Sequence, residues 1–205
     1  KSRTIGISKT NIDFFNKNIL NINKILWKIN KIEIYSDNLK NEKVLNFEKK
    51  DKSLFSIAKN YELYKVLLLA LEKSILFKKK KNNFNFFSKN YKLIFNCDQN
   101  NFISKKFFSK KFYKDYKSYA LTTIIDHKKI SNETAIQIFT KMGPFAFLPI
   151  SPKKTSVVYS IRGIKKINLK DIIEKYNSKY SIIKINEISN FKLITKNLRN
   201  YYFKN

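Results

Sequence analysis

Apolar and polar residues alternate most regularly between residues 135 and 160, in the run AIQIFTKMGPFAFLPISPKKTSVVYS. Turn-forming residues interrupt the alternation at Gly143-Pro144 and again at 151–154. The pattern predicts a β-hairpin whose return strand contains Val157, Val158 and Tyr159. Proline has no N–H to donate to a neighbouring strand, so we expect Pro149 and Pro152 at a strand end or at the edge of a sheet.

The same alternation predicts which side chains share a face of the hairpin. Successive residues of a strand point to opposite faces, so Phe145 and Phe147 are expected on one face and Ala146 and Leu148 on the other. Either face could form the wall of an apolar pocket, because core packing uses the same residue types. The sequence pattern does not choose between them.

Three segments have the i, i+3, i+4 spacing of apolar residues that is typical of an amphipathic helix. The clearest extends from Asn60 to Phe77, a second begins at a cap on Thr10 or Asn11, and a third covers 169–176 behind a cap on Asn168. Further strands are predicted at 28–37, 44–47, 91–97, 119–125, 181–188 and 191–193. The first two of these are expected to pair as a hairpin. Helices and strands together indicate a mixed α/β fold.

Length and charge limit the possible partners. The 205 residues are enough for one domain or two small ones with a buried core, and the net charge of +28 would suit a polyanion. Lysine is spread over almost the whole chain beside Asn, Ile, Phe and Tyr, which share AT-rich codons, so drift in genome composition explains much of the charge. The basic run Lys78–Asn90 is typical of a single-strand nucleic-acid surface or of a surface loop. We favour the loop, and no nucleic-acid partner is favoured.

The sequence lacks the residue combinations that several kinds of catalytic or metal-binding site require. Cys97 and His127 are the single cysteine and histidine, which leaves no internal disulfide and little support for a metal site or a Ser-His-Asp triad. No Gly-rich phosphate loop and no acid–base pair occurs, so neither catalytic nor metal-binding residues are predicted. No apolar run of about 18 residues and no signal-peptide pattern is present. A start at Lys1 suggests a fragment or a processed chain.

The central run also resembles a family signature. The segments QIF at 137–139, GPFAFLP at 143–149 and VVYS at 157–160 are similar to the phrases Q-x-F, G-P-x-A-x-L-P and V-V-W-S. These phrases mark the substrate domain of the FAD-dependent aromatic-ring hydroxylases of ubiquinone biosynthesis, which are para-hydroxybenzoate-hydroxylase-like flavin monooxygenases. Tyr159 replaces the usual tryptophan here. The resemblance covers only the middle portion of such an enzyme.

Three further matches give the cofactor residues that this resemblance implies. Arg3 opens the phrase RTIGIS, which is similar to R-T-I-A-L-S, where the arginine lies near the flavin. Asn60 matches an asparagine on the ribityl side of the flavin, although taken alone it is equally an N-cap. Asp98 matches the phrase G-A-D-G-x-N, in which Gln99 replaces a glycine that allows close backbone approach.

The resemblance also implies a domain organisation. Residues 1–27 and 53–110 would form a partial FAD-binding domain, and 28–52 with 111–193 a mixed-sheet substrate domain. Residues 194–205 would return the chain toward a further FAD motif. The fold expected is therefore a mixed-sheet substrate domain joined to a partial FAD-binding domain of the flavin monooxygenase type.

The activity implied is hydroxylation of the aromatic ring of a polyprenylated ubiquinone precursor, with FAD as cofactor and NAD(P)H as reductant. Phe145, Phe147 and Leu148 would contact the substrate, a polyprenyl phenol or quinone. Expected partners include a membrane surface, touched peripherally, and other proteins of that pathway. The expected compartment is the cytoplasm or the matrix side of an organelle inner membrane. The chain is expected to be inactive alone.

Two alternatives stay open from the residues. Gln99 and the short interval between Leu71 and Asp98 favour a non-catalytic remnant or interaction subunit of the same fold. The charge and the runs rich in lysine and phenylalanine favour a basic RNA-binding protein, such as an organellar ribosomal component. Strongly salt-dependent RNA binding would support the second alternative.

Overall fold

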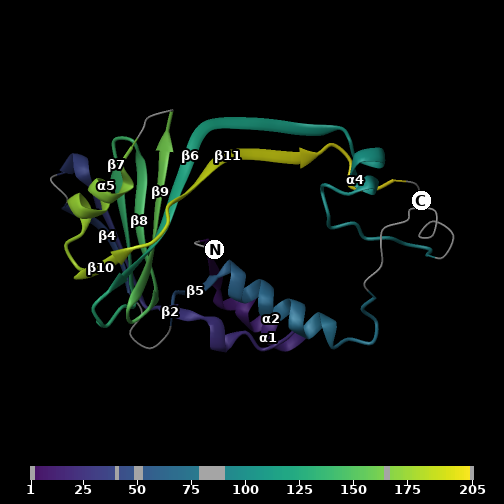
Figure 1. Ribbon diagram of the computed structural model, residues 1–205, viewed down its shortest axis with the longest axis horizontal. Helices are drawn as coiled ribbons and strands as arrows, with labels where there is room; N and C mark the ends of the chain where they lie inside the picture. The colour runs from purple at the N-terminus through teal and green to yellow at the C-terminus, as the bar shows by residue number, and fades with distance from the viewer. Residues whose placement is uncertain (1–2, 40–41, 49–52, 79–90, 164–166, 204–205) are drawn as a thin grey trace. The chain divides into compact units, whose positions relative to one another are not determined.

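The computed structural model describes residues 3–39, 42–48, 53–78, 91–163 and 167–203. The chain divides into two units (Figure 1). The first unit consists of Lys1–Ser74 and Lys117–Lys192, and the second of Ile75–Tyr116 and Leu193–Asn205. These units are defined by their internal contacts, whereas the domains expected from the sequence are defined by cofactor and substrate binding. The boundaries of those two domains stay a prediction.

The first unit contains most of a large mixed sheet. Its strands are β3 (Lys31–Ser36), β4 (Glu42–Glu48), β6 (Lys111–His127), β7 (Thr134–Thr140), β8 (Gly143–Ser151), β9 (Lys154–Arg162), β10 (Ile182–Ile185) and β11 (Ser189–Leu198). The order is β10-β6-β9-β8-β7-β3-β4, with β11 also paired to β6. β3 and β7 run parallel, whereas β7, β8 and β9 form an antiparallel meander. The predicted central hairpin and the pairing of β3 with β4 are confirmed.

A smaller sheet belongs to the same unit. Its order is β1-β5-β2, formed by β1 (Thr4–Ser8), β5 (Phe55–Lys59) and β2 (Trp27–Ile29). Two helices follow its strands, α1 (Lys9–Asn18) after β1 and α2 (Asn60–Glu72) after β5. The single strand predicted at 28–37 is wrong. Asn30 donates its N–H to the Glu133 carbonyl at 3.0 Å, and there the chain leaves the small sheet and enters the large one.

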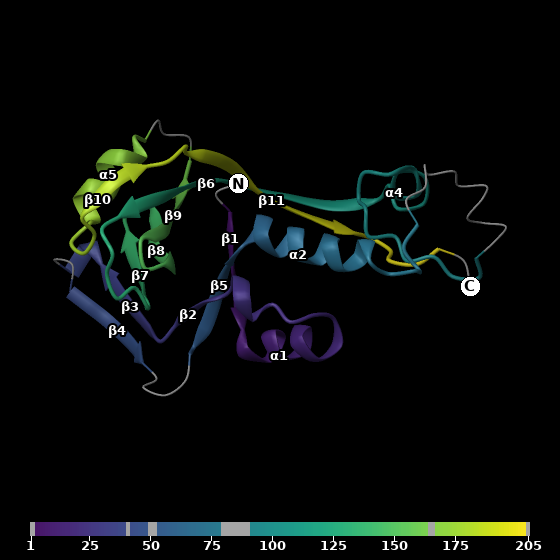
Figure 2. The same ribbon diagram turned by 60° about the horizontal axis from the view of Figure 1, so that its bottom comes forward.

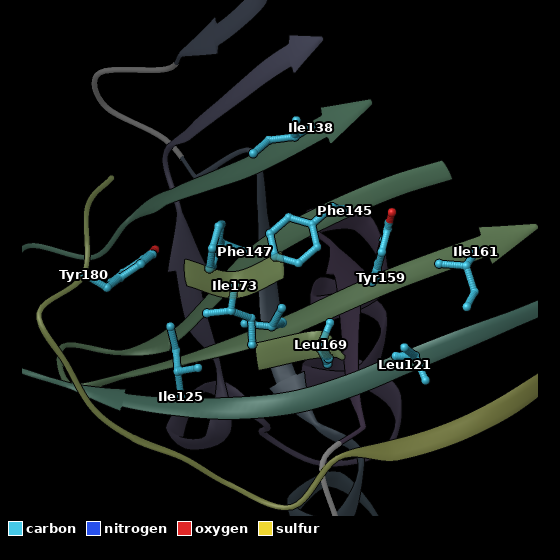
Figure 3. Close-up of a cluster of buried hydrophobic side chains, with 11 residues drawn as sticks. Leu121, Ile125, Ile138, Phe145, Phe147, Tyr159, Ile161, Leu169, Ile173 and Tyr180 are labelled. Atoms are coloured by element: carbon cyan, nitrogen blue, oxygen red, sulfur yellow. The ribbon is translucent and has the colours of Figure 1, made fainter. Parts of the chain in front are cut away.

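Helix α5 (Leu169–Tyr176) covers one face of the large sheet (Figures 1 and 2). Leu169 and Ile173 on the helix pack against a cluster of sheet residues that includes Phe145 and Phe147 (Figure 3). The opposite face packs on the small sheet, where Leu148 belongs to a cluster with Ile29, Ile57 and Ala135. The large sheet is therefore the middle layer of the first unit.

The ends of α1 and α2 differ from those predicted from the sequence, whereas the start of α5 agrees with the prediction. The cap of α1 is Ser8, whose hydroxyl accepts from the Asn11 N–H at 3.3 Å, so the prediction of Thr10 or Asn11 was wrong by two or three residues. The cap predicted for α5 on Asn168 is confirmed. α2 ends at Glu72, before the predicted Phe77, and the Ile75 side chain beyond it is 93% exposed.

The second unit has little regular structure among its described residues. It holds α4 (Phe102–Phe107) and the outer ends of β6 and β11. The strand predicted at 91–97 was wrong. These residues pair with no strand in the described part of the chain, and Leu93 is 70% and Phe95 85% exposed. Apart from Lys78, the basic run 78–90 lies outside the described residues.

Among the described residues, no helix combines the length and the hydrophobicity that a membrane-spanning segment needs.

Candidate functional site

Arg3 and Asn60, two of the three predicted cofactor residues, lie side by side in the first unit. The antiparallel register of β1 and β5 pairs Thr4 with Lys59, which places the residue before β1 beside the first residue of α2. The Asn60 N–H donates to the Arg3 carbonyl at 3.1 Å. Their proximity could not be predicted from the sequence, because it depends on the pairing of β1 with β5.

The Arg3 guanidinium stacks on the ring of Phe191, with its central carbon 3.8 Å from the ring centroid. Such stacking fixes a guanidinium while leaving its N–H groups directed outward in the ring plane. Arg3 is exposed, and no described carboxylate pairs with it. The group is therefore an oriented cation that is available to an anionic ligand.

Asn60 is not the cap of α2, so that alternative was wrong. The N-cap position is Lys59, whose side chain makes no capping bond and instead pairs with Glu62 at 2.8 Å. Asn60 is exposed as the first residue of the helix. Its side-chain amide is thus left available beside Arg3.

Asp98 lies in the second unit, in a turn before α4. Its carboxylate accepts from the Asn100 N–H at 2.8 Å, and its carbonyl accepts from the Ser104 hydroxyl. Asn101 caps α4 by accepting from the Ser104 N–H at 2.9 Å, and the Asn96 amide joins the same cluster. These bonds give Asp98 a structural role, and its cofactor role stays a prediction.

The predicted substrate residues divide between the two faces of β8. Phe145 and Phe147 are 0% and 1% exposed and lie on the α5 side, with their rings edge to face at 5.0 Å (Figure 3). Leu148 lies on the opposite side, against the small sheet that carries Arg3 and Asn60. The alternation of faces is confirmed, so the three residues cannot line one pocket together.

Gly143 and Pro149 show why the central run has its unusual residues. Gly143 has a φ of 140°, and a β-carbon there would lie 2.1 Å from the Ser160 carbonyl oxygen, so only glycine fits. Pro149 stands near the end of β8, where the pairing with β9 shifts between Pro149 and Ser151. This irregularity accommodates a residue without an N–H inside a central strand.

A cavity of about 210 Å³ opens on the α5 side of the sheet, between β3, β7, β8 and the end of α5. Its lining comprises Tyr35, Ile136, Ile138, Phe147, Lys175, Tyr176, Asn177, Ser178, Lys179 and Tyr180. Of the predicted substrate residues, only Phe147 lines this cavity. The wall thus contains aromatic and branched apolar side chains, together with Lys175 in the last turn of α5 and Lys179 just after the helix.

Behind Tyr180 lies a buried polar cluster that sequence analysis missed. The His127 ring packs on Tyr180 with centroids 4.6 Å apart. Its Nδ1–H donates to the Lys128 carbonyl at 2.8 Å, which leaves Nε2 to accept from the Thr155 hydroxyl at 3.0 Å. Asn132 donates to the same hydroxyl at 3.0 Å and accepts from the Tyr180 hydroxyl at 3.2 Å. Every side chain of the cluster has a partner, so it holds Tyr180 in place.

Comparison with known proteins identifies the fold. Two solved structures that match are the crystal structures of tetracycline destructase Tet(51), at 11% identity with a TM-score of 0.54, and of tetracycline destructase Tet(55), at 7% with 0.53. The fold resembles that of the tetracycline destructases. Each match covers 98% of this chain, which spans only 61% and 60% of the two structures. No family model and no curated protein matches the sequence.

These neighbours correct the family suggested by the sequence. The assignment to the ubiquinone-pathway hydroxylases was wrong: the fold neighbours are tetracycline destructases, which share the broad flavin monooxygenase fold. The structure explains the error, since Gly143 and Pro149 in the matched phrase are set by the backbone of the meander. Such residues indicate the fold and carry no information about the substrate.

The coarser prediction, a mixed α/β fold of the flavin monooxygenase type with a mixed sheet, is supported by the same neighbours. The expected polyprenyl substrate, membrane contact and pathway partners depended on the rejected family and are tested by no observation. The cavity and the His127 cluster had no local signal in the sequence, because each is assembled from segments far apart in the chain.

Proposed function

We propose that this chain is part of a flavin-dependent monooxygenase and supplies its sheet domain together with part of its cofactor-binding domain. The observation that carries the proposal is the likeness in fold to the tetracycline destructases over 98% of the chain. Because the chain spans about three fifths of those structures, the proposal concerns a part of the enzyme, consistent with the lack of a Gly-rich phosphate loop.

The residues at the small sheet fit a negatively charged cofactor such as FAD. Arg3 is stacked, exposed and without a described carboxylate partner, so it would bind an anionic portion of the cofactor. Asn60, held beside it by the backbone bond, would add an amide donor or acceptor. FAD, reduced by NAD(P)H, supplies the oxygen-activating chemistry, and the protein contributes binding, orientation and exclusion of water.

Leu148 is the predicted substrate residue best placed for this role. It lies on the sheet face that packs against the small sheet, the same sheet whose strands position Arg3 and Asn60. Phe145 and Phe147 lie on the other face. We propose that the oxidised substrate, an organic ring compound, approaches the Leu148 side of the large sheet, where Leu148 is only partly buried.

The test uses the polypeptide as its gene encodes it, purified without added flavin. We expect flavin absorbance in the purified protein and NAD(P)H-dependent consumption of oxygen. Arg3→Ala is expected to lower the flavin content at least tenfold, because it removes the available cation. Arg162→Ala, an exposed arginine at the end of β9, is the matched control and should retain flavin.

A protein that binds no added FAD and consumes no oxygen with NADH or NADPH would reject the proposal. Equal loss of flavin in both arginine variants would reject the assignment of Arg3 alone.

A further inference from the structure

The cavity on the α5 side of the large sheet has the shape of a ligand site that the proposed function does not use. Its walls are the rings of Tyr35, Phe147, Tyr176 and Tyr180, closed by two isoleucines of β7. Three of the lining residues, Ile138, Phe147 and Tyr180, belong to the buried cluster drawn in Figure 3. Aromatic walls of this kind favour a flat ring.

The size of the cavity limits the ligand. Drug-sized ligands occupy pockets of roughly 300–1,000 Å³, whereas an apolar cavity of about 150 Å³ is large enough to bind benzene. The cavity here, at about 210 Å³, lies between these values. It therefore has room for a single ring with one substituent.

The tyrosine hydroxyls are already engaged and do not recognise the ligand. Tyr35 donates to Glu33 at 3.0 Å, Tyr176 to Asp37 at 3.0 Å and Tyr180 to Asn132 at 3.2 Å.

The tyrosines are also neutral near pH 7. Burial, with the bond to Asp37, raises the pKa of Tyr176 to about 12, and burial raises the pKa of Tyr180 to about 12. These side chains therefore offer ring surfaces without negative charge.

Two ammonium groups supply the polar recognition. Lys175 and Lys179 line the cavity, and each lies near the ring of the tyrosine that follows it, at 4.9 and 5.7 Å. Neither has a carboxylate partner among the described residues. Burial lowers the pKa of Lys179, which shows that its charge is partly desolvated and would gain from a nearby anion.

Two carboxylates, Glu33 and Asp37, lie near the cavity, and Glu33 attracts the Lys179 ammonium electrostatically. Glu33 is paired with Lys31 at 3.1 Å and Lys43 at 2.7 Å, and it does not line the cavity. Asp37 accepts from the Tyr176 hydroxyl and also lies outside the lining. The charged groups that do line the cavity are both positive.

We propose that the cavity binds a small aromatic anion, with the ring between the tyrosine and phenylalanine side chains and the anionic group at Lys179 and Lys175. The proposal needs no flavin and is tested without it, so its failure is distinguishable from failure of the proposed monooxygenase function.

The probe is benzenesulfonate, compared with benzenesulfonamide, a neutral compound of nearly the same shape. Both are titrated into the purified chain by calorimetry or by the shifts of the isoleucine methyl resonances at 136 and 138. We expect benzenesulfonate to bind at least tenfold more tightly than the sulfonamide. Lys179→Gln should raise the Kd for benzenesulfonate about tenfold and leave the Kd for the sulfonamide unchanged.

Lys170→Gln is the matched control, since it removes the same charge from an exposed position in the first turn of α5. It should leave both affinities unchanged. This control matters because a net charge of +28 attracts any anion weakly. Ile136→Phe, which fills part of the cavity, should weaken both ligands and leave the circular dichroism spectrum unchanged.

Equal binding of the two probes, or equal losses in Lys179→Gln and Lys170→Gln, would overturn the proposal. Binding that survives Ile136→Phe in a folded protein would overturn it as well, because the anion would then occupy another site.

Discussion

The two units of this protein contain similar residue types but bury them very differently. The first unit holds three apolar clusters, the largest built from β6 to β9 and α5. Among the described residues of the second unit, only Ser104 is buried, and Leu76, Phe95 and Tyr202 are each more than three quarters exposed. Apolar residues form a core where strands or helices place them on one face, and apolar composition alone does not achieve this.

The largest expected effect tests this contrast with the same substitution in each unit. Phe145→Ala removes a ring that is 0% exposed, and we expect it to lower the free energy of unfolding by about 4 kcal/mol. Phe95→Ala removes a ring that is 85% exposed and should change it by less than about 0.5 kcal/mol. Urea denaturation measures both. Equal effects would show that the second unit has a core of its own.

Two glycines of the first unit provide a second test, in which backbone conformation is separated from packing. Gly143→Ala should cost about 3 kcal/mol or more, because the new β-carbon would meet the Ser160 carbonyl oxygen. Gly163 also has a positive φ, of 75°, but a β-carbon there meets nothing within 4 Å. Gly163→Ala should therefore cost only about 1 kcal/mol by thermal or urea denaturation. Similar values for both would argue against the close approach of β8 to β9.

Acid sensitivity of the first unit is expected to come from Glu33. Burial raises the pKa of Glu33, but hydrogen bonds from two lysines and Tyr35 outweigh burial and lower the pKa from 4.5 to about 2. Its folded pKa lies below its unfolded pKa, so its contribution to stability is complete above about pH 4.5 and is lost as the pH falls toward 2.

The contribution of Glu33 should amount to about 3 kcal/mol, and Glu33→Gln should remove this step from a plot of stability against pH. The control Glu174→Gln, at an exposed position of α5, should keep the step. An unchanged acid profile in Glu33→Gln would place the sensitive carboxylate elsewhere.

The smallest expected effects concern one helix cap from each unit. Asn168 caps α5 and Asn101 caps α4, each through its side-chain oxygen. Replacement by alanine should cost each helix about 1 kcal/mol. For Asn168→Ala the loss should appear in global unfolding, because α5 is part of the large core. For Asn101→Ala it should appear only as faster amide exchange in α4.

The sequence predicted elements well where local chemistry decides the structure. The meander, the pairing of β3 with β4 and the cap on Asn168 follow from alternation, turn residues and side-chain oxygens. Prediction failed at 91–97, because alternation cannot reveal whether a partner strand exists. It also failed at Asn30, where the predicted strand 28–37 is split between the two sheets. The split occurs at a hydrogen bond to Glu133, which is distant in the sequence.

The candidate sites followed the same rule. Arg3 and Asn60 were named from a resemblance, but their contact depends on the register of β1 and β5. The cavity beside Tyr180 forms where α5 packs near β7, and no local pattern in either segment predicts that contact. The wrong assignment to the ubiquinone-pathway hydroxylases came from reading a local pattern too far. The backbone allows only glycine at 143, so that residue reflects the fold alone.

The meander also has a consequence for the order of events in folding. β7 joins β8, and β8 joins β9, across two-residue turns, whereas the parallel pair of β3 and β7 brings residue 34 to residue 137. Short loops close quickly and long ones slowly, so we expect the meander to form first and to present β7 as the template on which β3 docks. Substitutions in the meander should then slow refolding, while substitutions on β3 should mainly accelerate unfolding.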